Sequence, residues 1–533
     1  MEKRLDRRAG VITVFLSLML IIMISFLLSL VKYALIQLGR DQAYVVSEMA
    51  IESVMGEYNI EAQEEFDLFL LDGSYGKGNF SESEILSHYK EYIEYETDMG
   101  KDIWSFNAKA LDWGCELSDA LITGIELATD NNGKAIITQL ANYMEDVYGI
   151  SYLKELTDKF SDSISGQVKD KQNSSTLLGN ILSGALTDMS GACDEENRKN
   201  IEKEEQKIIG PGQAQAEAMK SMTVRQSGSG LENWVKNLMG KAAYSLVVKN
   251  KDNVSKKETD TGSLFSTRKR SGNIRKGYGN VPAPPARHKL PENTLFKAYL
   301  YTHLNTYSEG SSEKLPLDYE IEYLLGGMGS DKENLGISAE HLLLLRSGIN
   351  LVFLLTDPNM RKGLDTAVKT ICAAIPVPGI SILAESILLV MWAVTESVVE
   401  LRDLFDNGRM EVIKTRENWR TSPDKLPDLI IDFLTGKRSD ITGTVSETAD
   451  AAGNGRKNNK GLTYKEWLMV LLSLENSEKA CSRYMDLVEA SIHKSQGNSA
   501  FKMDNCVVGM TVNNIWRISG GGEYSFDISY GYR

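Results

Sequence analysis

A run of 23 residues without Asp, Glu, Lys or Arg lies close to the start of this 533-residue sequence. It begins at Ala9 and ends at Val31. A helix of this length is about 35 Å long at a rise of about 1.5 Å per residue, which is enough to cross a hydrocarbon core of about 30 Å. We therefore predict a transmembrane helix at residues 9–31 that contacts the lipid bilayer.

Basic residues flank this run unequally. Only Lys32 and Arg40 follow it before acidic residues begin, whereas the leader at residues 1–8 holds Lys3, Arg4, Arg7 and Arg8. Basic residues favour the cytoplasmic side of a membrane. The sequence thus predicts a single-pass protein of the cell membrane, with a cytoplasmic N-terminus and an extracellular C-terminal bulk.

Two kinds of processing are alternatives to an intact anchor. A cleaved secretory signal has an apolar region of about 7 to 15 residues and small residues at its cleavage site, and this longer run lacks such a site. Cleavage on the cytoplasmic side after Gly10 would resemble prepilin processing. That processing usually goes with Glu five residues into the mature chain, where this sequence has Phe15. An uncleaved anchor is favoured, and processing after Gly10 stays open.

The helical pattern continues beyond the apolar run. Apolar residues recur at spacings of three, four and seven among charged ones, and no proline occurs before Pro211. This periodicity indicates an amphipathic helix with one apolar face. We predict one helix of roughly fifty residues that starts in the membrane and continues as a stalk, with Val11 to Tyr58 as its working part.

The N-terminal region also resembles a known group of proteins. The segment GVITVFLSLMLIIMISFLLSLVKYALIQLGRDQAYVVSEMAIESVMGEYN, followed by EEFDLFLLD, is similar to the N-terminal region of TadE/TadG-type pseudopilin-like proteins of the tight-adherence (Flp) pilus apparatus. The resemblance implies a pseudopilin-like or accessory component of a Tad-type pilus or secretion apparatus, with other proteins of that apparatus as partners.

A second resemblance extends from residue 11 to about residue 510, with the middle unmatched. The chain resembles an uncharacterised Gram-positive bacterial family of single-anchor proteins commonly encoded beside such pilus genes. That family has no established activity to transfer. The further segments that show the resemblance are TGIELATDNNGKAIITQLANYMEDVYG, LDYEIEYLLGGMGSDKENL, INLVFLLTDPNM, IKTRENW, GLTYKEWLMVLLSL and NCVVGMTV.

Composition and charge narrow the class of protein. Residues are 42% hydrophobic and 25% charged, which excludes a wholly disordered, collagen-like or polytopic membrane protein. The net charge of -14 argues against a general nucleic-acid binder, and we predict no nucleic-acid partner. This charge is uneven, because residues 41–160 hold 25 acidic and 7 basic residues while residues 249–290 hold 3 acidic and 11 basic ones.

The part outside the membrane is predicted to be an α+β fold, mainly helical, with short strands and a C-terminal β-hairpin. Residues 32–160 form an acidic α/β ectodomain that includes the stalk, with helices at 81–96 and 136–147, a strand at 121–129 and a turn at 130–133. Residues 161–293 are polar and contain SGSG and VPAPPARHKLPE, so they predict a partly disordered linker with short helices at 214–222 and 231–239. The basic stretch within it predicts a solvated linker.

Residues 294–533 are predicted to be a helical C-terminal domain. Alternation around Tyr319, Ile321 and Tyr323 predicts a half-buried strand. Ser330 is expected to cap a helix to about Thr356, and Asp357 with Pro358 to open another. The apolar stretch after Pro378 is either a second membrane span or a buried hairpin of helices, and its Glu residues favour the hairpin. Helices at 464–474 and 477–493 precede the terminal hairpin, in which residues 506–512 and 524–532 alternate.

Recognisable catalytic motifs are missing from the sequence. It has no GxxxxGK[ST], GxGxxG, HExxH or GxSxG pattern. Ser87 with Lys90, and Ser151 with Lys154, match only an SxxK spacing without its usual partner motifs. We therefore predict no catalytic, cofactor-binding or metal-binding residues, no cofactor and a non-enzymatic function. The alternative is a cell-wall-associated enzyme or an anionic-polymer-binding protein. The five histidines are scattered along the chain, at His88, His288, His303, His341 and His493. The five cysteines are too sparse for a disulfide framework, and they are Cys115, Cys193, Cys372, Cys481 and Cys506.

Overall fold

The computed structural model describes residues 2–103, 115–165, 242–282, 287–310, 315–375, 380–435, 437, 441–452, 459–495, 497 and 499–532. The chain forms two compact units. The sheet unit consists of Met1–Tyr143, Leu264–His288 and Ile492–Arg533, and the helical unit consists of Met144–Ser263 and Lys289–Ser491. The fold is α+β and mainly helical, as the sequence predicts.

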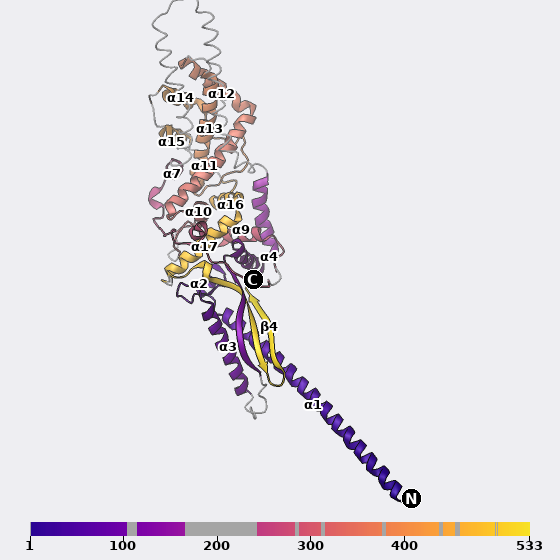
Figure 1. Cartoon of the computed structure of the whole chain (residues 1–533). Helices are drawn as coiled ribbons and strands as arrows, with labels where there is room; N and C mark the ends of the chain where they lie inside the picture. Colours follow the sequence, from indigo (N-terminus) through magenta and orange to yellow (C-terminus); the bar gives the residue numbers. More distant parts are fainter. Residues whose placement is uncertain are drawn as a thin grey trace, which may run out of the picture. The chain divides into compact units, whose positions relative to one another are not determined.

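The sheet unit contains the N-terminal helix and an antiparallel sheet (Figure 1). Strand β3 is central, since β2 pairs with it from Cys115↔Ile518 to Leu127↔Val507 and β4 pairs with it from Ile518↔Gly522 to Gly509↔Gly531. The short strand β1 pairs with the start of β3. Its elements are α1 (Glu2–Met55), α2 (Ile60–Phe66), β1 (Leu71–Asp72), α3 (Glu82–Ile103), β2 (Cys115–Leu127), α8 (Phe265–Ser271), β3 (Cys506–Ile518) and β4 (Gly522–Gly531).

The terminal hairpin is confirmed, but its place differs from the predicted domain division. Its turn contains Gly520 and Gly522 at φ of 74° and 81°, a backbone region that favours glycine. Because β3 pairs with β1 and β2, the hairpin belongs to the sheet unit rather than to residues 294–533 as a whole. Such pairing joins segments about 400 residues apart, which a division along the sequence cannot show.

The predicted long helix is confirmed as α1, one continuous helix of 54 residues. Helix α3 follows Ser81, whose hydroxyl accepts a hydrogen bond from the Glu84 backbone N–H, and so agrees with the predicted start. The strand β2 and the turn after it also agree with the prediction, and Asn131 and Asn132 adopt the left-handed conformation that asparagine tolerates.

Two helices of the helical unit begin at the predicted capping residues, and a third begins with a capping box that was not predicted. Ser330 caps α11, Asp357 caps α12 with Pro358 in the first turn, and Thr463 forms a capping box with Glu466 at α16. Helix α4 (Lys134–Ser165) begins in the sheet unit, and α17 ends there. The others are α7 (Ala243–Val247), α9 (Glu292–His303), α10 (Glu320–Gly326), α11 (Asp331–Thr356), α12 (Pro358–Ala374), α13 (Ile380–Phe405), α14 (Leu426–Leu434), α15 (Ile441–Ala452), α16 (Tyr464–Leu474) and α17 (Ser477–Ser495).

One secondary-structure prediction is wrong. The segment around Ile321 is helix α10 and not a strand. Its alternation of charged and apolar residues is typical of a half-buried strand, but every residue from Glu320 to Gly326 is buried. The carboxylates of Glu320 and Glu322 accept hydrogen bonds from the backbone N–H groups of Asn305 and Tyr307, so they are tolerated inside.

Part of the predicted linker is ordered. Within residues 242–282 the chain forms α7 and α8, and the latter belongs to the sheet unit. Arg268 pairs with Asp504 at 2.7 Å, and Tyr278 forms an antiparallel bridge with Ile125. These contacts hold a polar stretch that the composition predicts to be a solvated linker. The helices predicted at 214–222 and 231–239 lie outside the described residues.

The apolar helix after Pro378 is α13, and it lies inside the helical unit. Of the most apolar stretch of 18 residues in α13, 82% is buried by the protein itself, and the corresponding share in α11 is 67%. For α1 this share is 0%. By length and composition these three helices could each cross a membrane. The burial of α13 agrees with the predicted burial of this stretch, but the stretch is one continuous helix and not a hairpin of helices.

Candidate functional site: the anchor helix, a basic pocket and a buried ion network

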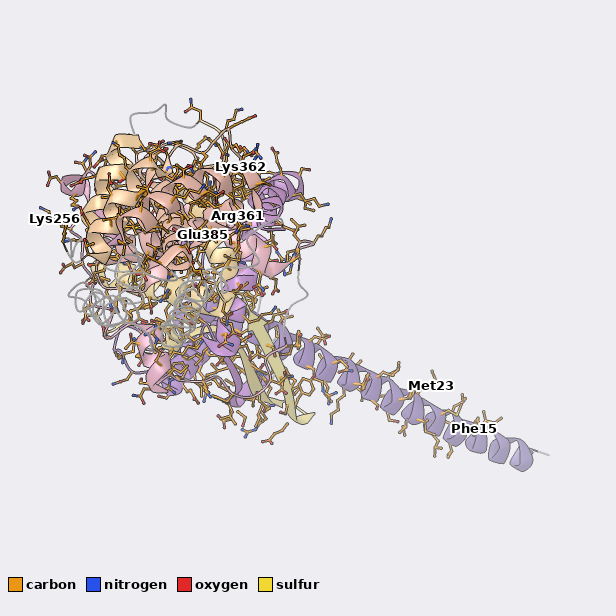
Figure 2. All side chains as sticks on the ribbon, turned by 90° about the horizontal axis from the view of Figure 1, so that it is seen from above. Phe15, Met23, Lys256, Arg361, Lys362 and Glu385 are labelled. Atoms are coloured by element: carbon orange, nitrogen blue, oxygen red, sulfur yellow. The ribbon has the colours of Figure 1, made fainter. Side chains whose placement is uncertain are left out.

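The first half of α1 is an exposed apolar cylinder. Side chains such as Phe15 and Met23 are 63% and 59% exposed and project away from the helix (Figure 2). A continuous apolar surface of this size requires a partner that removes it from water. The length of about 35 Å for residues 9–31 matches a bilayer core, so the helix fits a single membrane anchor.

The second half of α1 packs into the sheet unit. Ala43, Val46, Ala50 and Val54 are buried at spacings of three and four, so they form one face of the helix. This face contacts α3, β3 and β4. A polar link lies within the contact, because Trp516 Nε1 of β3 donates to Ser47 Oγ at 3.0 Å. The stalk is therefore a core element of the sheet unit.

Aromatic contacts extend this packing along the hairpin. The guanidinium of Arg40 lies 4.9 Å from the centre of the Tyr524 ring, and the rings of Tyr44 and Phe526 are 5.7 Å apart. Further along, the Tyr532 hydroxyl donates to the backbone carbonyl of Met55. Strand β4 thus follows α1 over most of the stalk.

A cluster of hydrogen bonds fixes the chain just after α1. The Glu57 carboxylate accepts hydrogen bonds from the hydroxyls of Tyr75 and Tyr92, both at 2.9 Å, and lies 3.0 Å from His88 Nδ1. Burial and the neighbouring Glu57 charge raise the pKa of Tyr75. These groups join the end of the stalk to α3, which is a structural role.

A polar pocket of about 630 Å³ lies in the sheet unit between β2, the turn after it and residues 274–281. Asp130 supports its wall by accepting the backbone N–H of Leu127 at 2.8 Å and that of Gly277 at 3.0 Å. Its other acidic residue is Glu126, and its basic residues are Lys269, Arg275 and Lys276. The pocket has the size of a small-ligand site and gathers cations from the predicted linker.

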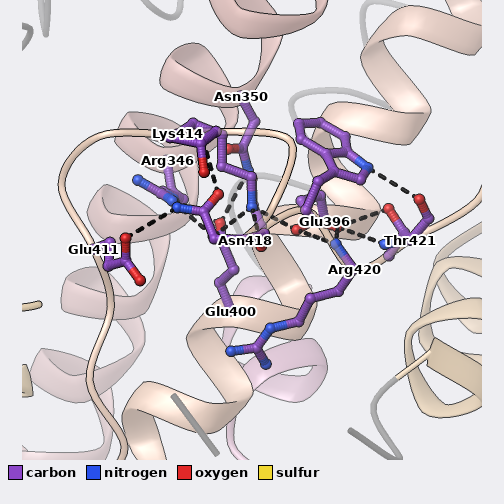
Figure 3. Close-up of polar contacts among 12 residues, drawn as sticks. Arg346, Asn350, Glu396, Glu400, Glu411, Lys414, Asn418, Arg420 and Thr421 are labelled. Atoms are coloured by element: carbon purple, nitrogen blue, oxygen red, sulfur yellow. Dashed lines mark hydrogen bonds and ion pairs between the residues drawn. The ribbon is translucent and has the colours of Figure 1, made fainter. Parts of the chain in front are cut away.

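A network of paired charges lies in the interior of the helical unit (Figure 3). Glu400 of α13 accepts from Arg346 Nε at 2.6 Å and from Lys414 Nζ at 2.8 Å, and Lys414 Nζ also donates to Glu396 at 2.6 Å. Glu396 also accepts from the backbone N–H and hydroxyl of Thr421. The network joins α11 and α13 to the loop after α13.

The charges within this network balance. Burial by itself raises the pKa of Glu400, but the adjacent Arg346 and Lys414 outweigh burial and lower it. The side chains of Lys414 and Glu396 are 1% and 0% exposed, so solvent does not screen their attraction. In this arrangement each buried charge has a partner of opposite sign, and no reactive group is exposed.

The sequence contains one signal for this network. Glu396 and Glu400 interrupt an apolar helix at a spacing of four, which places them on one face. Lys414 belongs to the segment IKTRENW. Two carboxylates in an apolar helix indicate a buried polar cluster, but the sequence does not select their partners.

Buried acids form a second polar cluster in the helical unit. Burial raises the pKa of Glu320 to about 8 and that of Glu322 to about 7. Tyr464 donates its hydroxyl to Glu322 Oε1 at 3.0 Å, while the buried Oε2 has no hydrogen-bond partner among the described residues. When Glu322 is protonated, its carboxyl group carries no charge, so no unpaired charge lies in this buried cluster.

The Ser and Lys residues with SxxK spacing and the five histidines do not form a common site in the described residues. Lys90 pairs with Asp119 at 3.3 Å, and His493 Nε2 contacts the backbone carbonyl of Phe501. Over the described ranges, no group of three or more His, Cys, Asp and Glu side chains is placed to hold a metal ion. Cys481 and Cys506 are both buried.

The chain belongs to a family of unknown function, DUF5702, which matches residues 224–518 and thus more than half of its length. The match includes the ion network and β3, and it does not include α1 or β4. No curated protein and no solved structure matches the chain.

Proposed function

We propose that this chain is a non-enzymatic, membrane-anchored surface protein that acts as a pseudopilin-like or accessory component of a Tad-type pilus or secretion apparatus. The observation that supports the proposal best is the division of α1 into an exposed apolar half and a half packed on an antiparallel sheet. One continuous helix, α1, thereby joins an apolar anchor to the folded sheet unit. The sequence resemblance over the same residues points to the pilus apparatus.

In this proposal the leader is cytoplasmic and the two units are extracellular. The four basic residues of the leader, against Lys32 and Arg40 on the other side, support this orientation. Protease protection in intact spheroplasts, followed by mass spectrometry of the native N-terminus, tests it. Digestion of both units with a protected leader is expected, and the same spectra report whether the chain is cleaved after Gly10.

The pilus role requires more of α1 than membrane attachment. We expect the native chain to co-purify with pilus or secretion proteins after cross-linking in cells. An exchange variant, in which residues 9–31 are replaced by an unrelated apolar helix of equal length, is expected to stay in the membrane and to lose these partners. The control substitutes exposed residues of α12 and is expected to keep both the membrane attachment and the partners.

The proposal fails if deletion of the gene leaves pilus assembly, adherence and secretion unchanged. It also fails if the native chain co-purifies with no component of the apparatus. If the exchange variant keeps all partners, the anchor sequence is not what the partners bind, and an accessory role through the extracellular units replaces the pseudopilin-like one.

A second candidate function is the binding of an anionic wall polymer. The pocket lined by Lys269, Arg275 and Lys276 supports it, because three basic residues border one concave surface. Phosphate-bearing polymers are the ligand class that such cations attract outside a cell.

Titration of the full-length protein in detergent with a poly(glycerol phosphate) polymer tests this candidate. The double variant Arg275→Gln, Lys276→Gln is expected to bind about tenfold more weakly or worse, since a hydrogen bond to a charged group contributes about 1.5–3 kcal/mol. The control, Arg361→Gln with Lys362→Gln, removes two basic residues of α12 (Figure 2). Equal loss in both variants would indicate only non-specific attraction.

A further inference from the structure

The turn between β3 and β4 lies beside the residues that follow the apolar run of α1. A Cβ placed on Gly520 would lie 3.1 Å from Cε of Lys32, and one placed on Gly521 would lie 3.0 Å from Cγ2 of Ile36. The apolar run ends at Val31. The turn is therefore packed against the first residues of α1 that would emerge from a bilayer.

The distances along α1 place this turn at a particular depth. From Val31 to Ile36 the helix rises about 7 Å, and the headgroup layer on each side of a bilayer is about 5–8 Å thick. Because the turn contacts Lys32 and Ile36, it lies within that layer if residues 9–31 span the hydrocarbon core. Tilting of α1 towards the side of the hairpin brings the turn closer to the core, and tilting away from that side raises it.

The surface chemistry of this end of the unit suits the headgroup layer. Residues 519–522 are Ser-Gly-Gly-Gly, which are exposed and carry neither charge nor bulk. The adjacent part of α1 exposes Tyr33 and Leu35, at 62% and 58%, beyond the apolar run. Tyrosine is enriched at this level of membranes, and a lysine such as Lys32 reaches from its apolar stem toward phosphate groups.

We infer that the β3–β4 turn is a membrane contact, which inserts among the lipid headgroups and sets the sheet upright on the membrane. This inference depends on the proposed anchoring by α1. Three contacts hold the hairpin along the stalk, at Arg40–Tyr524, Tyr44–Phe526 and Met55–Tyr532, so the turn cannot swing away from the surface while the unit is folded. The partner is the phospholipid headgroup.

Three exposed serines on the hairpin provide a depth series. Ser519 lies in the turn, Ser525 lies about 14 Å from Gly521 along β4, and Ser529 lies about 27 Å from it, at about 3.4 Å per residue. Each is changed to cysteine in a full-length chain in which Cys115, Cys193 and Cys372 are serine, and is labelled with a polarity-sensitive fluorophore. The buried Cys481 and Cys506 are kept.

The labelled proteins are reconstituted in vesicles of phosphatidylcholine and phosphatidylglycerol that contain a spin-labelled lipid. With the spin label on the headgroup, Ser519→Cys is expected to be quenched at least about twofold more than Ser529→Cys, with Ser525→Cys between them, because of this spacing. With the spin label deep in the acyl chain, none of the three is expected to be quenched. Leu27→Cys in α1 is the anchor control, and the acyl-chain label is expected to quench it.

The Leu27→Cys control distinguishes a failure of the membrane anchor from a failure of the membrane contact at the β3–β4 turn. If Leu27→Cys is quenched but Ser519→Cys and Ser529→Cys respond equally to the headgroup label, the membrane contact of the turn is wrong and the anchor stands. If Leu27→Cys is not quenched, the anchor is wrong and the position of the turn falls with it.

Discussion

Buried charge in the helical unit is compensated by ion pairing between adjacent side chains. Arg346 and Lys414 supply two cations, and Glu396 and Glu400 supply two carboxylates within hydrogen-bond distance. Desolvation of four charges offsets much of their attraction, so the intact network adds little net stability. Removing one member is different, because it leaves a charge without compensation.

The variant Lys414→Met is expected to lower the free energy of unfolding by about 3–5 kcal/mol, since the buried Glu396 then loses the cation that pairs with it. Urea unfolding of the full-length chain in detergent measures it. The control Lys479→Met removes an exposed ion pair with Glu475 and is expected to cost less than about 1 kcal/mol. A loss in Lys414→Met as small as in this control would contradict the role of the network.

The raised pKa of Glu320 predicts that the free energy of unfolding falls as pH rises. The carboxylate of an ordinary ion pair has the opposite effect, because its pKa is lowered. The pKa of Glu320 is raised from 4.5 to about 8, so between these values the folded state keeps a proton that the unfolded state releases. Stability therefore falls as pH rises through this window, by up to about 1.4 kcal/mol per pH unit for one group.

The variant Glu320→Gln is expected to be more stable than the native chain at pH 8 and to lose part of the slope between pH 5 and 8. Its amide oxygen can still accept from the Asn305 backbone N–H. Unfolding curves at several pH values measure the slope, and Glu417→Gln, at an exposed position, serves as control. An unchanged slope in Glu320→Gln would show that Glu320 is ionised in the fold.

At the scale of elements, α1 combines an exposed apolar half that fits a membrane anchor with a half that packs in the sheet unit. Residues 12–31 are exposed and apolar, whereas Ala43, Ala50 and Val54 are fully buried against the sheet. Hydrophobic periodicity predicted both halves, because a membrane requires apolar residues all round and a packed stalk requires one apolar face. The same reasoning failed at α10. Because every side chain there is buried, apolar and polar residues do not alternate with the period of a helix.

The variant Leu20→Arg is expected to weaken membrane attachment, because a central arginine costs about 2.5–3.5 kcal/mol on insertion. The fraction of protein that remains with membranes after carbonate extraction measures it. Leu121→Arg is the matched control, since Leu121 on β2 is 62% exposed and Leu20 is 59% exposed. Equal retention of Leu20→Arg and the native chain would argue against a spanning helix.

At the scale of the whole molecule, the chain has two separate cores. The sheet unit takes its residues from three segments and the helical unit from two. Ile51 is buried in the first and Leu468 in the second. A charge placed in one core is expected to destabilise that unit first, because a buried unpaired charge acts through its own contacts.

Hydrogen exchange measured by mass spectrometry tests this independence. Ile51→Asp is expected to raise exchange in β2, β3 and β4 before the helices of the other unit are affected, and Leu468→Asp is expected to do the reverse in α11, α13 and α16. Each variant is the control for the other. A rise in exchange across both units from either substitution would show a single cooperative core.

The sequence by itself determined the elements that depend on local chemistry. The apolar run, the caps at Ser330, Asp357 and Thr463, and the hairpin were predictable because adjacent residues alone satisfy their requirements. The Glu pair in α13 was visible too, but its cations come from Arg346 and Lys414 on other elements.

Only the tertiary structure decided which distant segments pair. It placed β3 against β1 and β2, the basic residues Lys269, Arg275 and Lys276 at the edge of a pocket, and the β3–β4 turn beside Lys32. These arrangements arise from packing between segments hundreds of residues apart, and a single sequence carries no periodicity that records such contacts. The apolar run of α1 was therefore predictable from its composition, whereas the position of the β3–β4 turn beside the end of this run was not.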